Sequence, residues 1–301
     1  MLNYQWGLLQ LPAPEALPAL EVAAAQRGPQ QAGAARLLGI LQVGQFTLLD
    51  LTLPLVELSE WPHAERLLSQ LVEQDGLNSL AYAYRGYVRA QQGDSNARAD
   101  LETANALEPF NALPYFLLGL VEREAENFGP SLDAFNSAYL LASDNPAIVA
   151  ELANAYQING DLPTAAEWFT VATTLAPEDA RFVALRAAFY AENAYALGPE
   201  GEGIAYLRQV AADFPTNAHI LTSWGWAQVQ QGELAAAETA LTEAWRLAPT
   251  DPRVRYFVGV WQERQNQIAA AIEHYSVVVE TENPYREAAQ TGLERLLGRL
   301  N

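Results

Sequence analysis

Apolar and polar positions alternate along this chain with the period of an α-helix, and the pattern is most regular over residues 146–179. In this stretch, PAIVAELANAYQINGDLPTAAEWFTVATTLAPED, two helical runs are separated by Gly160 and ended by Pro177. Apolar residues three or four positions apart form one stripe on each helix. Glycine and proline interrupt helices. The stretch is therefore predicted to fold as one helical hairpin.

The same pattern recurs before and after this stretch. Units that begin at residues 45, 79, 112, 146, 180, 218 and 252 follow one another at intervals of 33 or 34 residues, with one interval of 38. The longer interval places an insertion around residues 194–203. A small residue stands in six of the units where the first helix should meet its own second helix closely: Gly86, Gly119, Ala153, Ala187, Gly225 and Gly259. Repetition at this period indicates a stack of helical hairpins.

The spacing of individual residues carries a family resemblance. In residues 146–179 the pattern comprises Leu152, Ala153, Tyr156, Gly160, Ala165, Phe169, Ala172 and Pro177. This pattern resembles the tetratricopeptide repeat family, and the resemblance covers about residues 45–283. It implies an all-α fold: a right-handed superhelical solenoid of seven helical hairpins, closed by a C-terminal capping helix.

The two ends of the chain depart from the repeat. Residues 1–44 are expected to hold an extended lead-in over 1–14, because Pro12 and Pro14 oppose a helix, and then a divergent hairpin of residues 15–26 and 30–43, broken at Gly28 and Pro29. Residues 284–301 are predicted to form one amphipathic helix that covers the last hydrophobic edge of the solenoid. Asn145, Asp251 and Asn283 each precede a proline and are predicted to cap helices.

Composition narrows the possible partners and locations. The chain has 301 residues, is 50% hydrophobic and carries a formal net charge of −19. That charge argues against nucleic acid and against anionic membrane surfaces, because both attract clusters of basic residues. The N-terminus lacks the basic segment of a secretory signal, and no apolar run is long and uninterrupted enough to span a membrane. A cytoplasmic location is therefore expected.

Catalytic chemistry finds no support in the sequence. The absence of cysteine excludes disulfides, thiolates and zinc–sulfur sites. His63, His219 and His274 stand alone, without the spacing of a metal site or a nucleophile relay. The glycine-rich stretch at residues 198–203 lacks the lysine of a phosphate loop. We therefore predict a chain with no catalytic, cofactor or metal site.

The resemblance implies where a partner would bind. In tetratricopeptide folds the first helix of each unit lines the concave surface, and here that lining is apolar and aromatic in the N-terminal half. An exposed apolar surface of this kind normally marks a contact. The predicted partner-binding residues are Phe46, Leu49, Leu53, Tyr84, Tyr87, Phe116 and Leu120, with Trp226 and Tyr256 further on. The same lining includes the polar residues Glu151, Asn154, Arg181, His219, Arg253 and Arg264. Trp61, Trp168 and Trp224 are expected in the core.

These features favour a non-catalytic scaffold or adaptor that binds an apolar or basic peptide or helix of a protein partner in the concave groove. A carboxylate clamp like that of the co-chaperone members is not expected, because the chain has no lysine and Asn154 with Arg181 is only a fragment of it. In one alternative the chain's own first residues (Leu2, Tyr4, Trp6, Leu8 and Leu9) or a second copy fill the groove. In others the chain is a structural subunit of an assembly or homo-oligomer, or a regulatory module of an effector enzyme encoded elsewhere.

Overall fold

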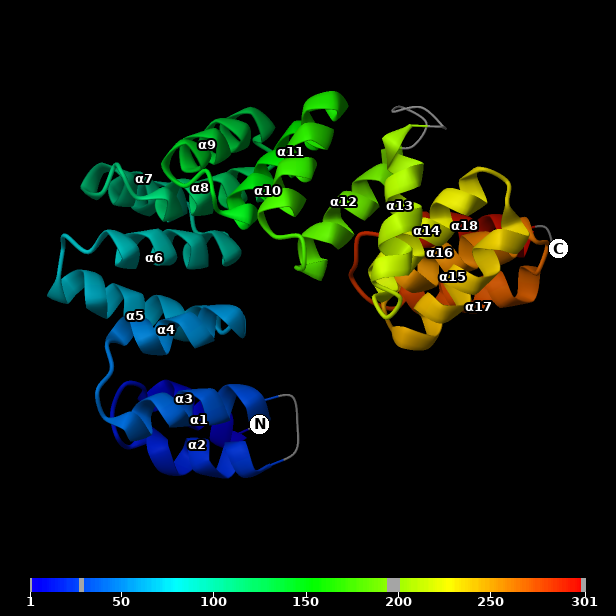
Figure 1. The fold of residues 1–301 in the computed structure, drawn as a ribbon. Coiled ribbons are helices and arrows are strands. Elements are labelled where there is room, and N and C mark those ends of the chain that lie inside the picture. Colours follow the sequence, from blue (N-terminus) through cyan, green and yellow to red (C-terminus); the bar gives the residue numbers. More distant parts are fainter. Residues whose placement is uncertain (1, 27–29, 194–200, 299–301) are drawn as a thin grey trace. The chain divides into compact units, whose positions relative to one another are not determined.

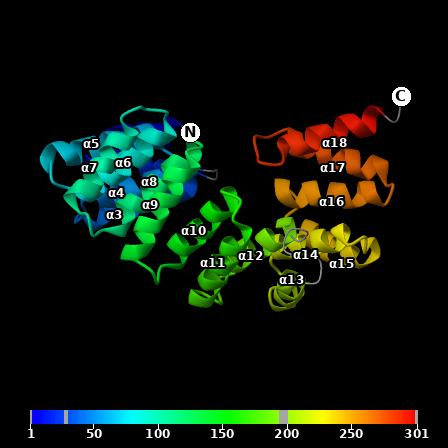
Figure 2. The same cartoon turned by 90° about the horizontal axis from the view of Figure 1, so that it is seen from above.

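The computed structural model describes residues 2–26, 30–193 and 201–298, and every regular element in them is an α-helix. The chain divides into two compact units, Met1–Ser143 and Asp144–Asn301. Each unit is a succession of helical hairpins (Figures 1 and 2). The sequence gives no sign of this division, because the unit that begins at Pro146 follows its predecessor at the ordinary spacing.

The described residues of the first unit form nine helices. They are α1 (Leu2–Gln10), α2 (Ala16–Ala25), α3 (Gln31–Val43), α4 (Leu48–Glu57), α5 (Trp61–Gln74), α6 (Ser79–Gln91), α7 (Ala97–Leu107), α8 (Ala112–Glu124) and α9 (Phe128–Leu141). Three hairpins, α4/α5, α6/α7 and α8/α9, correspond to repeat units. The helices α1, α2 and α3 precede them.

The described residues of the second unit form another nine helices. They are α10 (Pro146–Ile158), α11 (Leu162–Leu175), α12 (Ala180–Asn193), α13 (Glu202–Asp213), α14 (Ala218–Gln230), α15 (Leu234–Leu247), α16 (Pro252–Arg264), α17 (Ile268–Val279) and α18 (Arg286–Gly298). Four hairpins end at α17. The final helix α18 packs on α17 (Figure 2).

The extended lead-in expected over residues 1–14 is wrong, because Leu2–Gln10 form helix α1. Pro12 follows this helix and so does not interrupt it. Arg66 of α5 donates hydrogen bonds from Nη1 to the Leu11 carbonyl at 2.7 Å and from Nη2 to the Leu8 carbonyl at 3.0 Å. These bonds satisfy carbonyls that a helix C-terminus leaves without partners. The expected break at residues 28 and 29 and most of the expected insertion lie outside the described residues.

Helix starts follow the capping chemistry that the sequence predicts. The side chains of Asn145 and Asp251 each accept a first-turn backbone N–H at 3.0 Å, with proline at the first helical position. Asn283 also accepts a backbone N–H, that of Tyr285 at 2.9 Å, but the helix begins only at Arg286. The first two predictions are confirmed, and the third differs by a short turn.

Small residues let the two helices of a hairpin approach closely. A Cβ atom on Gly225 would lie 2.5 Å from Leu241 Cγ, and one on Gly119 would lie 2.7 Å from the ring of Phe135. Each large side chain therefore occupies the space that the glycine leaves open. This confirms the predicted role of the small positions at these sites.

The internal turns of six hairpins share a left-handed backbone residue. These residues are Ser59, Gly93, Glu126, Gly160, Gly232 and Asn266, with φ between 57° and 84°. Glycine adopts this conformation without steric cost, whereas other residues pay for their Cβ. At Glu126 the next amide, from Asn127, donates to the Glu122 carbonyl at 2.8 Å and closes the turn.

The expected core positions of three tryptophans are confirmed in part. Trp61 is half-buried against the apolar cluster of α1–α5, which includes Leu51, Leu55 and Leu67. Trp168 and Trp224 are half-buried against the large cluster of the second unit. These indoles therefore edge the core and do not lie inside it.

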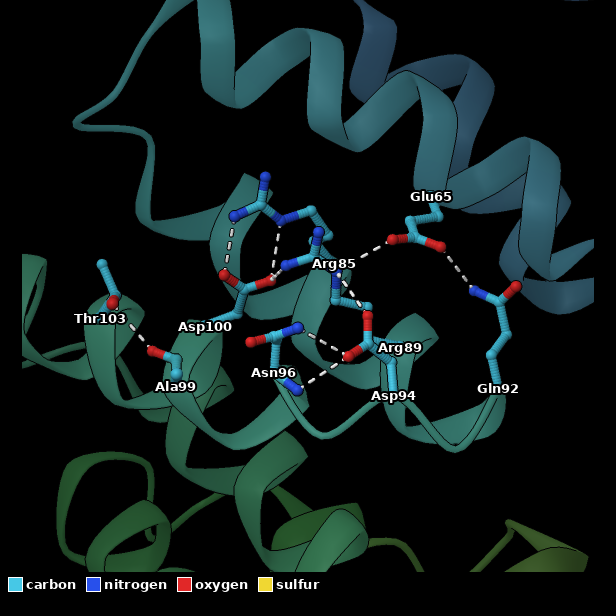
Figure 3. A network of polar contacts seen from close by, with 9 residues as sticks. All are labelled: Glu65, Arg85, Arg89, Gln92, Asp94, Asn96, Ala99, Asp100 and Thr103. Atoms are coloured by element: carbon cyan, nitrogen blue, oxygen red, sulfur yellow. Dashed lines mark hydrogen bonds and ion pairs between the residues drawn. The ribbon is translucent and has the colours of Figure 1, made fainter.

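A buried ion network ties α5, α6 and α7 together (Figure 3). The Asp100 carboxylate, with a side chain 8% exposed, accepts two hydrogen bonds from Arg85 and one from Arg89, each at 2.7 Å. Arg89 also donates to Glu65 at 2.9 Å and lies 3.6 Å from Asp94. Burial alone lowers the pKa of Arg89, but the hydrogen bonds with Glu65 and Asp100 and the charges of both carboxylates outweigh burial and raise it. The network therefore links three helices by hydrogen bonds between charged groups.

Candidate partner-binding surface

The first helices of the repeat hairpins form one face in each unit, here called the first-helix face. It comprises α4, α6 and α8 in the first unit and α10, α12, α14 and α16 in the second. Packing between α6 and α8, and between successive first helices from α10 to α16, makes the face continuous over those helices. Side chains on it come from different repeats at equivalent positions, so a repeated sequence position becomes a row.

All nine residues predicted to bind a partner are half-buried. Phe46 and Leu49 lie against the cluster of α1–α5, and Tyr87 and Leu120 lie against the apolar cluster of α6, α7 and α8. The remaining residues in the first unit are Leu53, Tyr84 and Phe116, and those in the second are Trp226 and Tyr256. One part of each side chain thus contacts the core and the other part faces solvent. The apolar lining of the N-terminal half is therefore less exposed than the sequence predicts.

Ring contacts within the protein account for much of this burial. Tyr87 meets Trp61 edge to face at a centroid distance of 6.2 Å, and Phe116 meets Phe135 in the same way at 5.9 Å. Such pairs stabilise the stack of helices. If a partner protein binds here, Tyr87 and Phe116 contact it only with the ring surface that their intramolecular partners leave exposed.

Two of the chain's first residues belong to the apolar cluster against which Phe46, Leu49 and Tyr84 pack. Tyr4 and Leu8 of α1 are buried in the cluster of α1–α5, together with leucines of α2, α3, α4 and α5. Trp6 and Leu9 are 59% and 61% exposed. The alternative in which the first residues fill the groove therefore takes another form, because α1 packs on α2 and its Tyr4 and Leu8 enter the core.

One hollow, of about 390 Å³, lies where α3 meets α4 in the first unit. Phe46 and Leu53, two of the predicted anchors, line it together with Ile40 and Val43. Arg36 and Asp50 stand at the same hollow, and Arg36 pairs with Glu57 of α4. The hollow therefore joins apolar walls to charged groups of both signs.

A second hollow, of about 400 Å³, lies on the first-helix face of the second unit. Ala184, Leu185 and Ala188 of α12 give it an apolar wall, and Arg181, His219 and Arg253 stand around it. These last three occupy the second residue of α12, α14 and α16. The stacking of helices therefore brings together one sequence position from three repeats.

The charged groups of this hollow already have partners. Arg181 binds Asp179 with contacts of 2.6–3.2 Å, and His219 Nε2 lies 3.2 Å from an Asp251 carboxylate oxygen. Arg253, whose side chain is only 11% exposed, donates from Nη2 to Ser223 Oγ at 3.0 Å. The Arg253 Nε–H is buried and has no hydrogen-bond partner among the described protein atoms. The hollow therefore combines an apolar wall with polar groups that are already paired, and the Arg253 Nε–H lies buried away from solvent.

The aromatic anchors of the second unit belong to a ring cluster beside this hollow. Trp226 packs on Phe257 at 4.9 Å, and Tyr256 stacks on Tyr285 at 5.3 Å. The Arg264 guanidinium lies 6.0 Å from the centre of the Trp226 ring. Tyr285, from the turn before α18, is a member of this cluster that the sequence pattern does not reveal, because it lies outside the repeats.

Sequence reasoning noted Arg181, His219 and Arg253 as lining residues but chose none of them as anchors. The signal that could have found them is their shared position in three successive repeats. The sequence also does not reveal the Asp100 network, because the pairing of Asp100 with Arg85 and Arg89 depends on how α6 and α7 face one another.

The histidines show no joint chemistry. His63 is half-buried, and its Nε2 lies 3.4 Å from Gln5 Oε1. His274 is buried and meets Trp245 edge to face at 5.0 Å. The described residues contain no group of three or more acidic or histidine side chains placed to hold a metal ion. None of the described helices combines the length and apolar character needed to cross a membrane.

Models of the tetratricopeptide repeat match residues 116–180 and 196–261. Among curated proteins none matches the chain. Solved structures resemble it in fold. A tetratricopeptide repeat protein from Parabacteroides merdae superposes with a TM-score of 0.67 at 12% identity, over 83% of this chain and 97% of its own.

Two further structures show the same likeness. The Cut9–Hcn1 hetero-tetramer of the APC/C contains a chain that gives a TM-score of 0.57 at 17% identity, over 98% of this chain and 55% of that one. A thermophilic repeat protein of Thermus thermophilus gives 0.52 at 16% identity, over 62% of this chain and 98% of that one.

Two parts of the chain match tetratricopeptide repeats, and the described residues have the all-α solenoid fold of solved tetratricopeptide repeat proteins, as the sequence predicts. This fold suggests a scaffold for protein–protein interaction, in a family that is generally non-catalytic.

Proposed function

We propose that this protein is a non-catalytic adaptor whose first-helix face binds an extended or helical segment of a partner protein. The observation that carries the proposal is the hollow over α12, α14 and α16, where an apolar wall of Ala184, Leu185 and Ala188 lies beside Arg181, His219 and Arg253. An apolar partner side chain would fill the space beside Leu185, and the Arg181 guanidinium, with a side chain 82% exposed, would face a carbonyl or carboxylate of the same segment.

The first unit contributes the predicted anchors to the same proposal. Phe46 and Leu53 already border a hollow, so a partner side chain can reach them without unfolding the core. Tyr84, Tyr87, Phe116 and Leu120 would add their remaining surface. Aromatic and large apolar anchors dominate binding energies, and we expect alanine at Phe46 or Leu53 to cost about 2 kcal/mol of partner affinity.

The test compares partner recovery by variants that fill or empty the two hollows. Full-length chain, the Ala188→Trp variant and the Phe46→Ala, Leu53→Ala double variant are used for affinity purification from the cells that make the protein, with quantitative mass spectrometry. A tryptophan at the exposed Ala236 of α15 is the matched control. Loss of the same partner with either hollow variant, but not with the control, supports the proposal. Equal recovery by all four proteins would refute binding at this face.

Light scattering on the purified chain addresses the structural-subunit alternative. A monomer fits an adaptor with an open face. A stable homo-oligomer that Ala188→Trp dissociates would instead assign the hollow to a permanent interface between copies.

A further inference from the structure

Two turns of the first unit expose large apolar side chains. Leu77, between α5 and α6, is 76% exposed, and Phe110, between α7 and α8, is 88% exposed. Both stand two residues before the first helix that follows. At the same position the later turns carry Asp144, Glu178, Thr216 and Thr250. Leu77 and Phe110 therefore differ from the polar residues that this position carries before the first helices of the second unit.

The two side chains belong to one edge of the unit. Successive helices from α5 to α8 reverse direction, so the α5–α6 and α7–α8 turns lie at the same end of the hairpins (Figure 1). Helices α6 and α8, which begin at these turns, pack against each other. Residues 73–78 and 107–111 are called the turn edge below.

Hydrogen bonds hold both turns in place. The Leu77 amide donates to Asp75 Oδ1 at 3.1 Å, and the Asn78 amide donates to the Asp75 carbonyl at 3.2 Å. In the other turn the Asn111 amide donates to the Glu108 carbonyl at 3.1 Å, and its side-chain amide to Glu108 Oε2 at 2.8 Å. An ordered backbone presents the two side chains, so a partner would have little backbone entropy to remove on binding.

The charge around these side chains has one sign. Glu73, Asp75 and Glu108 are exposed at the turn edge, and residues 67–84 and 99–122 contain no arginine, lysine or histidine. A second copy of this chain, with its net charge of −19, and an anionic lipid surface would both meet like charge. A basic segment would meet opposite charge.

We propose that the turn edge binds a basic amphipathic segment of a partner protein. Its apolar side chains would cover Leu77 and Phe110, and its arginines or lysines would face Glu73, Asp75 and Glu108. This surface is separate from the first-helix face, so the proposal holds or fails independently of the function proposed above.

Selection from a library of displayed 16-residue peptides, with the full chain as target, tests the proposal. The enriched peptides should carry net positive charge with apolar residues three or four positions apart. Their affinity should fall at least about tenfold for the Leu77→Thr, Phe110→Thr double variant, since each side chain acts as an anchor. The Asp75→Asn, Glu108→Gln variant keeps both turn acceptors and should bind more weakly, with a smaller dependence on salt.

A matched control removes exposed apolar groups elsewhere. Leu9 and Leu140 are 61% and 80% exposed, and the Leu9→Thr, Leu140→Thr variant should bind the selected peptides unchanged. Circular dichroism checks that all variants are folded. The proposal is overturned if no peptide is enriched, if the enriched peptides are neutral or acidic, or if they bind the Leu77, Phe110 variant as tightly. Binding to phosphatidylserine vesicles that depends on Leu77 and Phe110 would likewise overturn it in favour of a membrane.

Discussion

Replacing Asp100 by asparagine should destabilise the first unit by about 3 kcal/mol. The carboxylate accepts three hydrogen bonds of 2.7 Å from two guanidinium groups whose side chains are only 12% and 19% exposed. Removing one partner of a buried ion pair costs roughly 3–5 kcal/mol, because a buried charge is left uncompensated. The lower end applies because Arg89 keeps Glu65, whereas Arg85 loses its anionic partner.

Urea unfolding of the full chain measures this loss, and amide hydrogen exchange in α6 and α7 locates it, because repeat proteins are stabilised by nearest neighbours. The Glu102→Gln variant is the control: its pair with Arg98 has side chains more than half exposed, so we expect a change below about 0.5 kcal/mol. The Arg85→Met, Asp100→Leu double variant should recover part of the stability lost by Asp100→Leu alone. A loss below about 1 kcal/mol for Asp100→Asn would show that water screens the network and would refute the reasoning.

Four further variants test packing, backbone conformation and titration. Gly225→Ala should lower stability by about 1–3 kcal/mol in urea unfolding, because its Cβ would lie 2.5 Å from Leu241 Cγ, whereas Gly39→Ala, with open space around it inside α3, should raise stability by about 0.5–1 kcal/mol. Glu126→Gly, at φ 60°, should raise it by up to about 1 kcal/mol, and an unchanged or lower midpoint would contradict the strain. Burial, and then the charge of Arg255, lower the pKa of His274, so on acidification the unfolded chain takes up the proton first. The stability present above about pH 6.5 should therefore fall as pH drops below it, by up to about 1.4 kcal/mol per pH unit, and this slope should shrink in the His274→Phe variant measured over the same range.

The first-helix face was predictable in its positions but not in its exposure. Phe116 and Tyr87 were assigned to this face from their place in the repeat, and they lie on the helices expected. Their half-burial depends on Phe135 and Trp61, which reach them from other helices at distances that only the packing sets. Conversely, Arg181, His219 and Arg253 became neighbours because three helices stack in register.

The sequence by itself determined the all-α solenoid, the small positions at helix contacts and two proline-supported helix starts. These features depend on local periodicity and on capping chemistry within a few residues, and the pattern that indicates the hairpins recurs in successive repeats. The tertiary structure decided that residues 2–10 form a helix, because Arg66, 55 residues beyond Leu11, satisfies the carbonyls at its end. It also decided the burial of Asp100 and the hollows, because these depend on side chains that meet across helices and cannot be read from spacing along one chain.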